Sequence, residues 1–429
     1  MSSYRIRPSK LQGLIFIPPS KSHTLRAILF ALLAKGRSEI RHYLHSPDAT
    51  AMIYAIRCLG AVVDIQQDRL LIDGVDLKLK PSDDIINAGN SGIVLRFIGA
   101  LAALLPTYTI ITGDHSIRHN RPVRPLLEGL KQLGAFAESM RQDGYAPIII
   151  RGPLQPGTAT LDGQDSQPVS GLLIACSFLP GPTTLNVQNP GEKPWIDLTL
   201  FWLRRFGIEI THQDYTRYHI PGNARLDAFS LAIPGDFSSA AFPIAAALVT
   251  DSELTIQNID MQDCQGDKEL IPALQRMGAR LEIDASSHTL IVRKGSQLQG
   301  IQLDINNYID ALPILAVIAC YAQGTTLITG AAIARQKESD RIHAIATELK
   351  KMGARLEERP DGLLIHNSPL KGATLASHHD HRIAMATAVA ALGAIGESRI
   401  DGIECIAKTY PTFATDFQAI KAQLEVVHK

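Results

Sequence analysis

The chain of 429 residues has no excess of charge, because 42 Lys and Arg residues balance 42 Asp and Glu residues. A neutral chain argues against a protein that binds nucleic acid or a membrane surface through bulk charge, although a local basic pocket remains possible. Long apolar runs are also missing, since the longest, "ALPILAVIACYA" at 311–322, is too short to span a bilayer. The first residues, "MSSYRIRPSK", lack the apolar segment of a secretion signal. We therefore expect a soluble cytoplasmic protein that binds neither nucleic acid nor a membrane.

Cysteine is scarce, and its spacing carries no metal or disulfide signal. The five cysteines form no C-x-x-C pair, which gives zinc and disulfide interpretations little support and fits a reducing cytosol. The chain also has no G-x-x-x-x-G-K-[ST] and no G-x-G-x-x-G motif. Nothing in these patterns therefore supports a nucleotide cofactor.

One pattern recurs five times and reads as a helix that ends at a glycine, followed by a strand, a turn and a second strand. Its copies lie at 54–74, 126–152, 200–222, 270–295 and 344–367. Their glycines, Gly60, Gly134, Gly207, Gly278 and Gly353, suit the position just after a helix end. The stretches that follow alternate as strands do.

A second pattern is a polar cluster that leads directly into an Ala-rich apolar helix. The six copies begin at Ser20, Asn90, Asp165, Asp236, Asp310 and Asp380. The spacing of roughly 70–75 residues is that of a large repeat, and six copies in two sets of three predict two similar α/β domains. Helices that are apolar all round are buried, and only their ends face a ligand. If the two helix bundles pack side by side, six helix N-termini would converge on one cleft suited to an anion.

The stretch "PPSKSHTLRA" from residue 18 has two interpretations. Lys21, Ser22 and Arg26 either belong to a capped helix with solvated cations or form an anion site. Ser22 and Arg26 share a helix face. A charge on an otherwise apolar helix is costly unless it is paired, so Arg26 favours the anion site.

Four other polar stretches also have two interpretations each when only their local sequence is considered. The arginines at 118, 121 and 124 form a surface loop or an anion site, and "NAGNSG" at 87–92 forms a turn or a close backbone approach to a ligand. "SHHDHR" at 377–382 is a conceivable metal site, but Arg382 would repel a cation and a helix cap at an anion site fits better. Asp310 is either the N-cap of its helix or a base near the cations.

Nine stretches then occur in a specific order: "PPSKSHTLRA", "NAGNSG", "RHNRPV", "DSQ", "KPWIDLTL", "PGDFSSAAF", "QKESDR", "DHRIAMA" and "AKTYPTF". Together, from about residue 10 to residue 417, they resemble the 5-enolpyruvylshikimate-3-phosphate (EPSP) synthase family, the 3-phosphoshikimate 1-carboxyvinyltransferases, as a divergent member. The resemblance implies an α/β fold of two similar domains, each of three βαβαββ repeats with buried helices (an inside-out α/β barrel), joined by a two-strand hinge. The expected domains are residues 20–233, and residues 1–19 together with 234–429.

The resemblance also implies a reaction. The family transfers the enolpyruvyl group of phosphoenolpyruvate to the 5-hydroxyl of shikimate 3-phosphate and releases phosphate through a tetrahedral intermediate, without a metal or organic cofactor. The reaction belongs to the shikimate pathway, which leads to chorismate and the aromatic amino acids, and we expect a monomer. The alternatives are a related carboxyvinyltransferase that acts on UDP-N-acetylglucosamine or on an unphosphorylated shikimate-like acceptor, and a non-catalytic binding protein. The first of these carries a cysteine ahead of an Arg-Pro pair, and "GDHSIRHNRP" has none.

Site residues follow from the matched motifs. By resemblance Asp310 takes the proton of the 5-hydroxyl, Glu338 protonates the methylene carbon of phosphoenolpyruvate, and Lys21 and Lys408 stabilise the charge of the intermediate. Phosphoenolpyruvate would be bound by Lys21, Gly92, Arg121, Gln167, Arg341, Arg382 and Lys408. Shikimate 3-phosphate would be bound by Lys21, Ser22, Arg26, Ser166, Gln167 and Lys337. Further substrate-binding candidates are Asn90, Trp195 and His381.

This sequence departs from the family pattern at several of these places. Asp165 and Glu192 stand where the family has serines that contact the substrate phosphate. Carboxylates there would repel a dianion unless they turn away or are offset by a neighbouring lysine. Trp195 replaces a Tyr, and Ile333 replaces an Asn that touches shikimate 3-phosphate. Ile93 replaces a Thr next to the place where glyphosate binds in this family, and we expect it to weaken that inhibitor.

Overall fold

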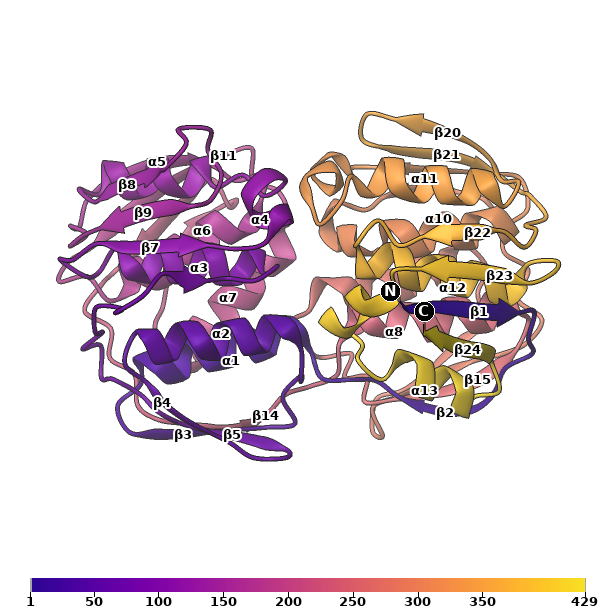
Figure 1. Cartoon of the computed structure of the whole chain (residues 1–429), viewed down its shortest axis with the longest axis horizontal. Coiled ribbons are helices and arrows are strands. Elements are labelled where there is room, and N and C mark those ends of the chain that lie inside the picture. The colour runs from indigo at the N-terminus through magenta and orange to yellow at the C-terminus, as the bar shows by residue number, and fades with distance from the viewer. Residues whose placement is uncertain (1, 429) are drawn as a thin grey trace. The chain divides into compact units, whose positions relative to one another are not determined.

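The computed structural model describes residues 2–428, and their contacts divide the chain into two compact units. Unit 1 consists of Met1–Pro19 and Pro234–Lys429, and unit 2 consists of Ser20–Ile233. The chain therefore passes between the units twice, and unit 2 is an insertion between strand β2 (Gln12–Phe16) and helix α8 (Phe237–Val249) of unit 1 (Figure 1). No helix within residues 2–428 has the length and apolar character needed to cross a membrane.

The described part of unit 2 contains three four-stranded sheets, and equivalent strands occupy the same position in each sheet. The first runs β14 (Ser230–Ala232), β3 (Arg37–Arg41), β5 (Arg69–Asp73), β4 (Val62–Ile65). The second runs β6 (Ile86–Asn87), β7 (Thr109–Thr112), β9 (Ile148–Arg151), β8 (Phe136–Ser139), and the third runs β10 (Thr158–Asp162), β11 (Thr183–Gln188), β13 (Arg217–Ile220), β12 (Thr211–Gln213).

Unit 1 repeats this order in the three sheets of its described residues. They run β2, β15 (Glu253–Gln257), β17 (Thr289–Val292), β16 (Leu281–Asp284); then β18 (Gln302–Asp304), β19 (Thr325–Thr329), β21 (Gly362–His366), β20 (Arg355–Arg359); and finally β22 (Thr374–Ala376), β23 (Ser398–Asp401), β1 (Ser2–Arg7), β24 (Gln423–His428). In all six sheets the first pair is parallel and the other pairs are antiparallel. A parallel pair needs a crossover, which helical structure supplies in four of the sheets, whereas β14 and β3, and β2 and β15, pair although they lie far apart in the chain. The shared arrangement of the six sheets fits βαβαββ repeats, and the expected fold class is confirmed.

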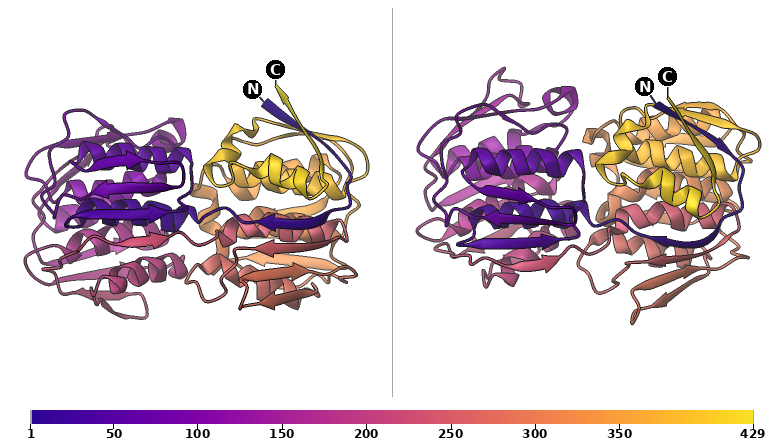
Figure 2. Two further views of the ribbon diagram at one scale, coloured as in Figure 1. Left: turned by 90° about the horizontal axis from the view of Figure 1, so that it is seen from below. Right: turned by 60° about the horizontal axis from the view of Figure 1, so that its bottom comes forward.

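Strands from distant parts of the chain complete a sheet in each unit. Strand β14, at the end of unit 2, pairs with β3 so that Ser230 lies opposite Glu39. Strand β1 lies between β23 and β24 in the last sheet of unit 1, as Figure 1 shows. Figure 2 shows β2 alongside the strands of the β15–β17 sheet, to which it is bonded through β15. The outermost strands of the described chain, β1 and β24, and the last strand of unit 2, β14, are thereby held by sheet hydrogen bonds.

Some helices of each unit are buried almost throughout, and the others have an exposed side. The helices of unit 2 are α1 (Lys21–Leu33), α2 (Pro47–Cys58), α3 (Gly92–Ala102), α4 (His115–His119), α5 (Arg124–Gln132), α6 (Ser166–Ser177) and α7 (Lys193–Arg205). Unit 1 has α8, α9 (Leu270–Arg276), α10 (Leu312–Tyr321), α11 (Arg341–Lys351), α12 (His381–Gly393) and α13 (Phe413–Ala419), and the short 3₁₀ helices η1 (Gly266–Glu269), η2 (Asn306–Ala311), η3 (Ala332–Gln336) and η4 (Ile403–Lys408). Every residue of α3 and α8 is buried, and α1, α6, α10 and α12 are buried almost throughout. Each buried Leu or Ile side chain contributes about 1.5–3 kcal/mol, so these apolar helices form the core of their unit.

The starts of the buried helices follow the expected pattern with two differences. Side chains of the expected residues cap α1, α6, α8 and α12, namely Ser20, Asp165, Asp236 and Asp380. Helix α3 is capped by Ser91 rather than by Asn90, where the apolar pattern was expected to begin. Asp310 is not an N-cap, because it lies in η2 and α10 begins only at Leu312.

The ends of five other helices, α2, α5, α7, α9 and α11, also agree with the sequence analysis. The glycines that end the helix in the five copies of the helix–strand–turn–strand pattern have positive φ angles. These angles are 106° at Gly60, 87° at Gly134, 74° at Gly207, 97° at Gly278 and 91° at Gly353. A residue with a Cβ atom is strained in this left-handed region, so glycine is favoured there.

Candidate active site

The residues expected in the active site divide between the two units. Unit 2 holds Lys21, Ser22, Arg26, Asn90, Gly92, Arg121, Ser166, Gln167 and Trp195, and unit 1 holds Asp310, Lys337, Glu338, Arg341, His381, Arg382 and Lys408. Each set is described within its own unit.

Arg26 is a buried cation in the middle of α1, with 2% of its surface exposed. Its Nε and Nη2 atoms donate to Thr199 Oγ1 at 3.1 and 2.8 Å, and Nη2 also donates to the Trp195 carbonyl at 3.2 Å. Its Nη1 atom donates to the Ser22 carbonyl at 3.2 Å, and the guanidinium carbon lies 5.2 Å from the centre of the Phe97 ring. Arg26 is therefore not solvated, and the start of α1 is both a capped helix and a buried cationic site.

Two other residues of this set contact acidic side chains of unit 2. The Lys21 ammonium lies 3.9 Å from an oxygen of Asp48, which is buried in the first turn of α2. The side-chain amide of Asn90 donates to Asp114 Oδ2 at 2.5 Å. Asp114 in turn caps α4, so this bond connects the segment before α3 with the start of α4.

Gly92, Gln167 and Arg121 gather around a residue that the sequence analysis missed. Arg96 lies one turn inside α3 and is 1% exposed. Its Nη1 atom donates to Gln167 Oε1 at 3.0 Å and to the Gly92 carbonyl at 3.3 Å, and its Nη2 atom donates to the Pro122 carbonyl at 2.9 Å. The signal for Arg96 was present, since it is a charge on an apolar helix as Arg26 is.

The basic stretch before α5 contributes one buried arginine. Arg121 is 4% exposed, whereas Arg124 is exposed at the start of α5. Arg118 is partly exposed and donates to the Gly113 carbonyl at 2.9 Å. Of the three arginines, Arg121 therefore fits a site inside unit 2, and the other two fit its surface.

The two unexpected carboxylates of unit 2 are both bonded to nearby donors. Asp165 Oδ1 accepts the N–H of Gln167 at 3.0 Å, and its Oδ2 lies 2.9 Å from Arg96 Nη2. Glu192 is 3% exposed, and its Oε2 atom accepts both the N–H and the hydroxyl of Ser166 at 3.1 Å. The charge of Asp165 is thus offset by Arg96, whereas the sequence analysis had considered only a neighbouring lysine for this role.

The set in unit 1 is centred on Arg341, the first residue of α11, which is 2% exposed. Its Nη1 atom donates to Asp310 Oδ1 at 2.7 Å, its Nη2 atom to Glu338 Oε2 at 2.7 Å, and its Nε atom to Asp380 Oδ2 at 2.8 Å. Burial disfavours the charged guanidinium, but the three carboxylates outweigh this effect and raise the pKa of Arg341. Arg341 is therefore always charged.

Asp310 and Glu338 each bridge two cations. Asp310 Oδ2 accepts from Arg382 Nη2 at 2.7 Å, in addition to the bond from α11, and Arg382 Nη2 also donates to the Ser238 hydroxyl at 3.0 Å. Glu338 Oε1 accepts from Lys408 Nζ at 2.7 Å. Because arginines from two other helices take its carboxylate, Asp310 does not cap α10.

Lys337, His381 and Ile333 complete the expected positions. Lys337 is 8% exposed at the end of η3, and Ile333 is buried within η3. The ring of His381 is fully buried, with Nδ1 3.6 Å from Asp380 Oδ1.

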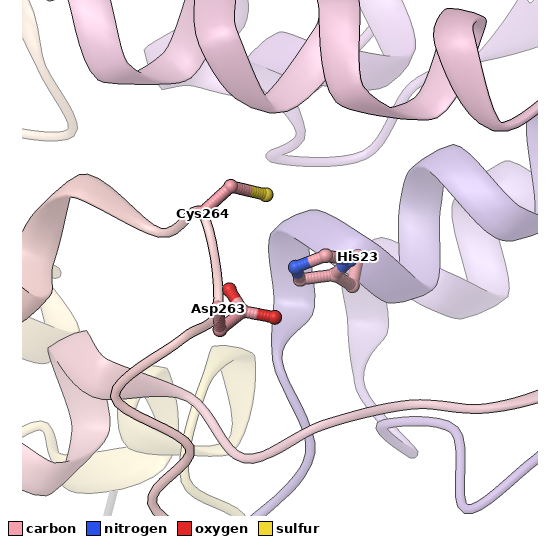
Figure 3. A group of neighbouring side chains, drawn as sticks. All are labelled: His23, Asp263 and Cys264. Carbon is pink, nitrogen blue, oxygen red and sulfur yellow. The ribbon is translucent and has the colours of Figure 1, made fainter.

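Among the histidines before α12, His378 Nε2 lies 2.6 Å from Glu348 Oε1. Within either unit, no three His, Cys, Asp or Glu side chains of residues 2–428 lie close enough together to hold a metal ion. Figure 3 draws His23, near the start of α1, and Asp263 and Cys264, which precede η1. These three belong to different units, so no metal site is inferred from them.

Both units thus place buried arginines and carboxylates at the starts of buried helices, which is an arrangement of enzymes that act on small anions. The sequence profile of the EPSP synthase family, the 3-phosphoshikimate 1-carboxyvinyltransferases, matches residues 6–417. The chain therefore belongs to the EPSP synthase family, as the nine motifs indicated.

Individual relatives agree over the whole chain. The 3-phosphoshikimate 1-carboxyvinyltransferase of Chlamydia caviae is 42% identical over 431 residues, which cover 100% of this chain and 96% of the relative. That of Acetivibrio thermocellus is 41% identical over 409 residues, which cover 95% of this chain and 96% of the relative. The solved structure of EPSP synthase from Acinetobacter baumannii superposes with a TM-score of 0.82 at 28% identity and covers 100% of both chains.

Proposed function

We propose that the chain acts as a 3-phosphoshikimate 1-carboxyvinyltransferase. It transfers the enolpyruvyl group of phosphoenolpyruvate to the 5-hydroxyl of shikimate 3-phosphate and releases phosphate, as part of aromatic amino-acid biosynthesis. The observation that carries this proposal is the network of unit 1, in which Asp310 and Glu338 are each bonded to two cationic side chains. Carboxylates that handle protons, held among cations that bind anions, suit the addition of a hydroxyl to an anionic enol and the later loss of phosphate.

Binding of phosphoenolpyruvate is assigned to the cations around these carboxylates. Arg341 and Arg382 already bind a carboxylate, that of Asp310, with two bonds of 2.7 Å. The carboxylate of phosphoenolpyruvate has the same chemistry and competes for these donors, which makes the Asp310 carboxylate available to the acceptor. Lys21, Gly92, Arg121, Gln167 and Lys408 are assigned to the same substrate.

Proton transfer is assigned to the two carboxylates. In the addition step the 5-hydroxyl oxygen attacks the second carbon of phosphoenolpyruvate, Asp310 takes the hydroxyl proton, and Glu338 protonates the methylene carbon. In the elimination step the methyl carbon returns a proton to the Glu338 carboxylate, the carbon–oxygen bond to phosphate breaks as phosphate takes the proton held by Asp310, and the double bond is restored. Lys408, whose Nζ lies 2.7 Å from Glu338 Oε1, and Lys21 stabilise the charge of the tetrahedral intermediate.

Binding of shikimate 3-phosphate is assigned to three groups of residues. Ser22 and Arg26 hold the ring carboxylate, a role supported by the burial of Arg26. The phosphate is assigned to Ser166, Gln167 and Lys337, with Asn90, Trp195 and His381 as further contacts. Glu192 already occupies the Ser166 donors, so it competes with the phosphate there.

Three finer statements belong to the same proposal. The functional domains are residues 20–233, and residues 1–19 with 234–429, which match the two units. The chain acts as a monomer in the cytoplasm, and its five cysteines, all free thiols, fit a reducing compartment. No metal or organic cofactor takes part.

A phosphate-release assay with purified protein tests the proposed acceptor. Phosphoenolpyruvate is combined in turn with shikimate 3-phosphate, with shikimate and with UDP-N-acetylglucosamine. We expect phosphate release with shikimate 3-phosphate and a far lower kcat/KM with the other two. Turnover with only shikimate or only UDP-N-acetylglucosamine would show that the acceptor is wrong.

A further inference from the structure

Glu348 is a buried carboxylate of α11 to which the reaction gives no role. Its side chain is 0% exposed, and it lies two helical turns beyond Arg341, roughly 10 Å along the helix. Lys351 Nζ donates to both of its oxygens at 2.9 Å, the N–H of Ala376 donates to Oε2 at 3.0 Å, and His378 Nε2 lies 2.6 Å from Oε1. Burial disfavours the charged carboxylate, but these donors outweigh burial and lower the pKa of Glu348. Glu348 is therefore ionised at neutral pH.

Two of these four bonds hold the turn that leads into α12. His378 and His379 have φ angles of 52° and 56°, in the left-handed region that is unfavourable for residues with a Cβ atom. Such backbone persists where its surroundings fix it. Inside the turn, the hydroxyl of Ser377 accepts the N–H of His379 at 3.2 Å and its carbonyl accepts the N–H of Asp380 at 3.0 Å. Glu348 fixes the same turn from outside, through the side chain of His378 and the N–H of Ala376.

The turn ends at Asp380, which binds the guanidinium group of Arg341 and the backbone N–H of Arg382, the two arginines assigned to phosphoenolpyruvate. Asp380 is 0% exposed, and its Oδ2 atom accepts from Arg341 Nε at 2.8 Å and from the Ser339 hydroxyl at 3.1 Å. Its Oδ1 atom accepts the N–H of Arg382 at 2.9 Å and so starts α12. Helix α11 thus binds segment 376–380 at both ends, through Glu348 at one end and through Arg341 at the other.

We propose that Glu348 and His378 are positioning residues for phosphoenolpyruvate. They fix segment 376–380, which places Asp380, and Asp380 orients the guanidinium group of Arg341 and holds the backbone N–H of Arg382. Neither residue touches a substrate. The proposal rests on the proposed function, because it takes the two arginines to bind the carboxylate of phosphoenolpyruvate.

Two substitutions of His378 separate its hydrogen bond from its backbone conformation. His378→Asn keeps a residue that tolerates left-handed φ angles, so the variant is expected to fold, but its shorter side chain does not reach Glu348. His378→Gln carries an amide N–H at about the distance of Nε2 and restores the bond. Loss of a hydrogen bond to a charged group predicts a rise in KM for phosphoenolpyruvate of about tenfold in His378→Asn. In His378→Gln we expect KM to stay close to that of the unmodified chain.

The control and the second variant lie on α11. His343→Ala removes an exposed histidine that is bonded to Glu358 at 3.1 Å, away from the turn, and is expected to leave both KM values unchanged. Glu348→Gln replaces one carboxylate oxygen with an amide group, whose N–H groups then face one of the donors that surround Glu348. This variant is expected to raise KM for phosphoenolpyruvate at least as much as His378→Asn.

The readout is the ratio of two KM values, measured for each substrate with the other saturating. We expect KM for phosphoenolpyruvate to rise while KM for shikimate 3-phosphate stays within about twofold, since a single hydrogen bond is changed on one side of the reaction. Equal rises in both KM values, or an unchanged KM for phosphoenolpyruvate in His378→Asn and Glu348→Gln, would overturn the positioning role while the unmodified chain remains active. Absence of turnover by the unmodified chain would instead overturn the proposed function and this inference with it.

Discussion

Replacing Gly92 by alanine tests how closely the first turn of α3 approaches the residues around it. A Cβ atom at position 92 would lie 2.7 Å from Arg96 Nη1, 3.0 Å from Gln167 Oε1 and 3.4 Å from Arg121 Nη1. The first distance is too short for a carbon and a nitrogen, so the arginine must move. Its Nη1 atom is bonded to Gln167 at 3.0 Å, and the movement breaks or lengthens this bond.

The size of the effect follows from the charge of the broken contact. A hydrogen bond to a charged group contributes about 1.5–3 kcal/mol, and each 1.4 kcal/mol is a factor of ten in affinity. We therefore expect Gly92→Ala to raise KM for phosphoenolpyruvate by about 10- to 100-fold, with a smaller change in kcat. The assay is steady-state phosphate release with shikimate 3-phosphate saturating and phosphoenolpyruvate varied.

Gly99→Ala is a matched control on the same helix. A Cβ atom there would meet only apolar atoms nearby, Leu126 Cδ2 at 3.3 Å and Ile150 Cδ1 at 3.4 Å. Alanine is favoured over glycine by about 0.5–1 kcal/mol in the middle of a helix, and thermal unfolding of both variants reports how each substitution changes stability. An unchanged KM in Gly92→Ala, or an equal rise in both variants, would refute the reasoning.

Three further changes have expected outcomes. Glu192→Ser removes the carboxylate that occupies the N–H and hydroxyl of Ser166, and should lower KM for shikimate 3-phosphate in steady-state kinetics; a higher KM would contradict this. Ile93→Thr replaces an ethyl group with a hydroxyl at the first turn of α3 and should lower the glyphosate concentration that halves activity; equal inhibition of both proteins would count against this. Burial raises the pKa of the Cys176 and Cys320 thiols to about 12, so at pH 8 an alkylating reagent should modify them only after unfolding, as mass spectrometry can establish. Rapid modification of the folded protein would contradict the burial.

Local sequence signals were sufficient for the starts of α1, α6, α8 and α12 and for the helices that end before a glycine with positive φ. A cap such as Ser20 or Asp236 acts on N–H groups two or three residues away, and a glycine such as Gly60 acts on its own helix. Both effects depend on neighbours in sequence, which is why the repeat predicted them correctly. Pairing of β1 with β24 joins residues at opposite ends of the chain, and no local pattern indicates it.

The site itself depends on contacts that are distant in sequence. Asp310 resembles an N-cap locally, but guanidinium groups 31 and 72 residues away take its carboxylate, and α10 starts two residues later. Arg96 carried the same signal as Arg26 and was missed because no motif drew attention to it. Glu348 reads as an ordinary residue of an amphipathic helix, so its contact with the turn before α12 has no sequence signal. The convergence of six helix starts on one cleft stays a prediction.

Phosphate release by Asp310→Asn tests the central claim most directly, which is that the carboxylate bound by two arginines takes the proton of the 5-hydroxyl. The variant keeps the size of the side chain but accepts a proton poorly, and Asp284→Asn, at the exposed end of β16 in unit 1, is the matched control. With phosphoenolpyruvate and shikimate 3-phosphate both saturating, we expect kcat of Asp310→Asn to fall by at least about 100-fold, in the range of a lost general base, while the control keeps full activity. Unchanged phosphate release by Asp310→Asn would contradict the account.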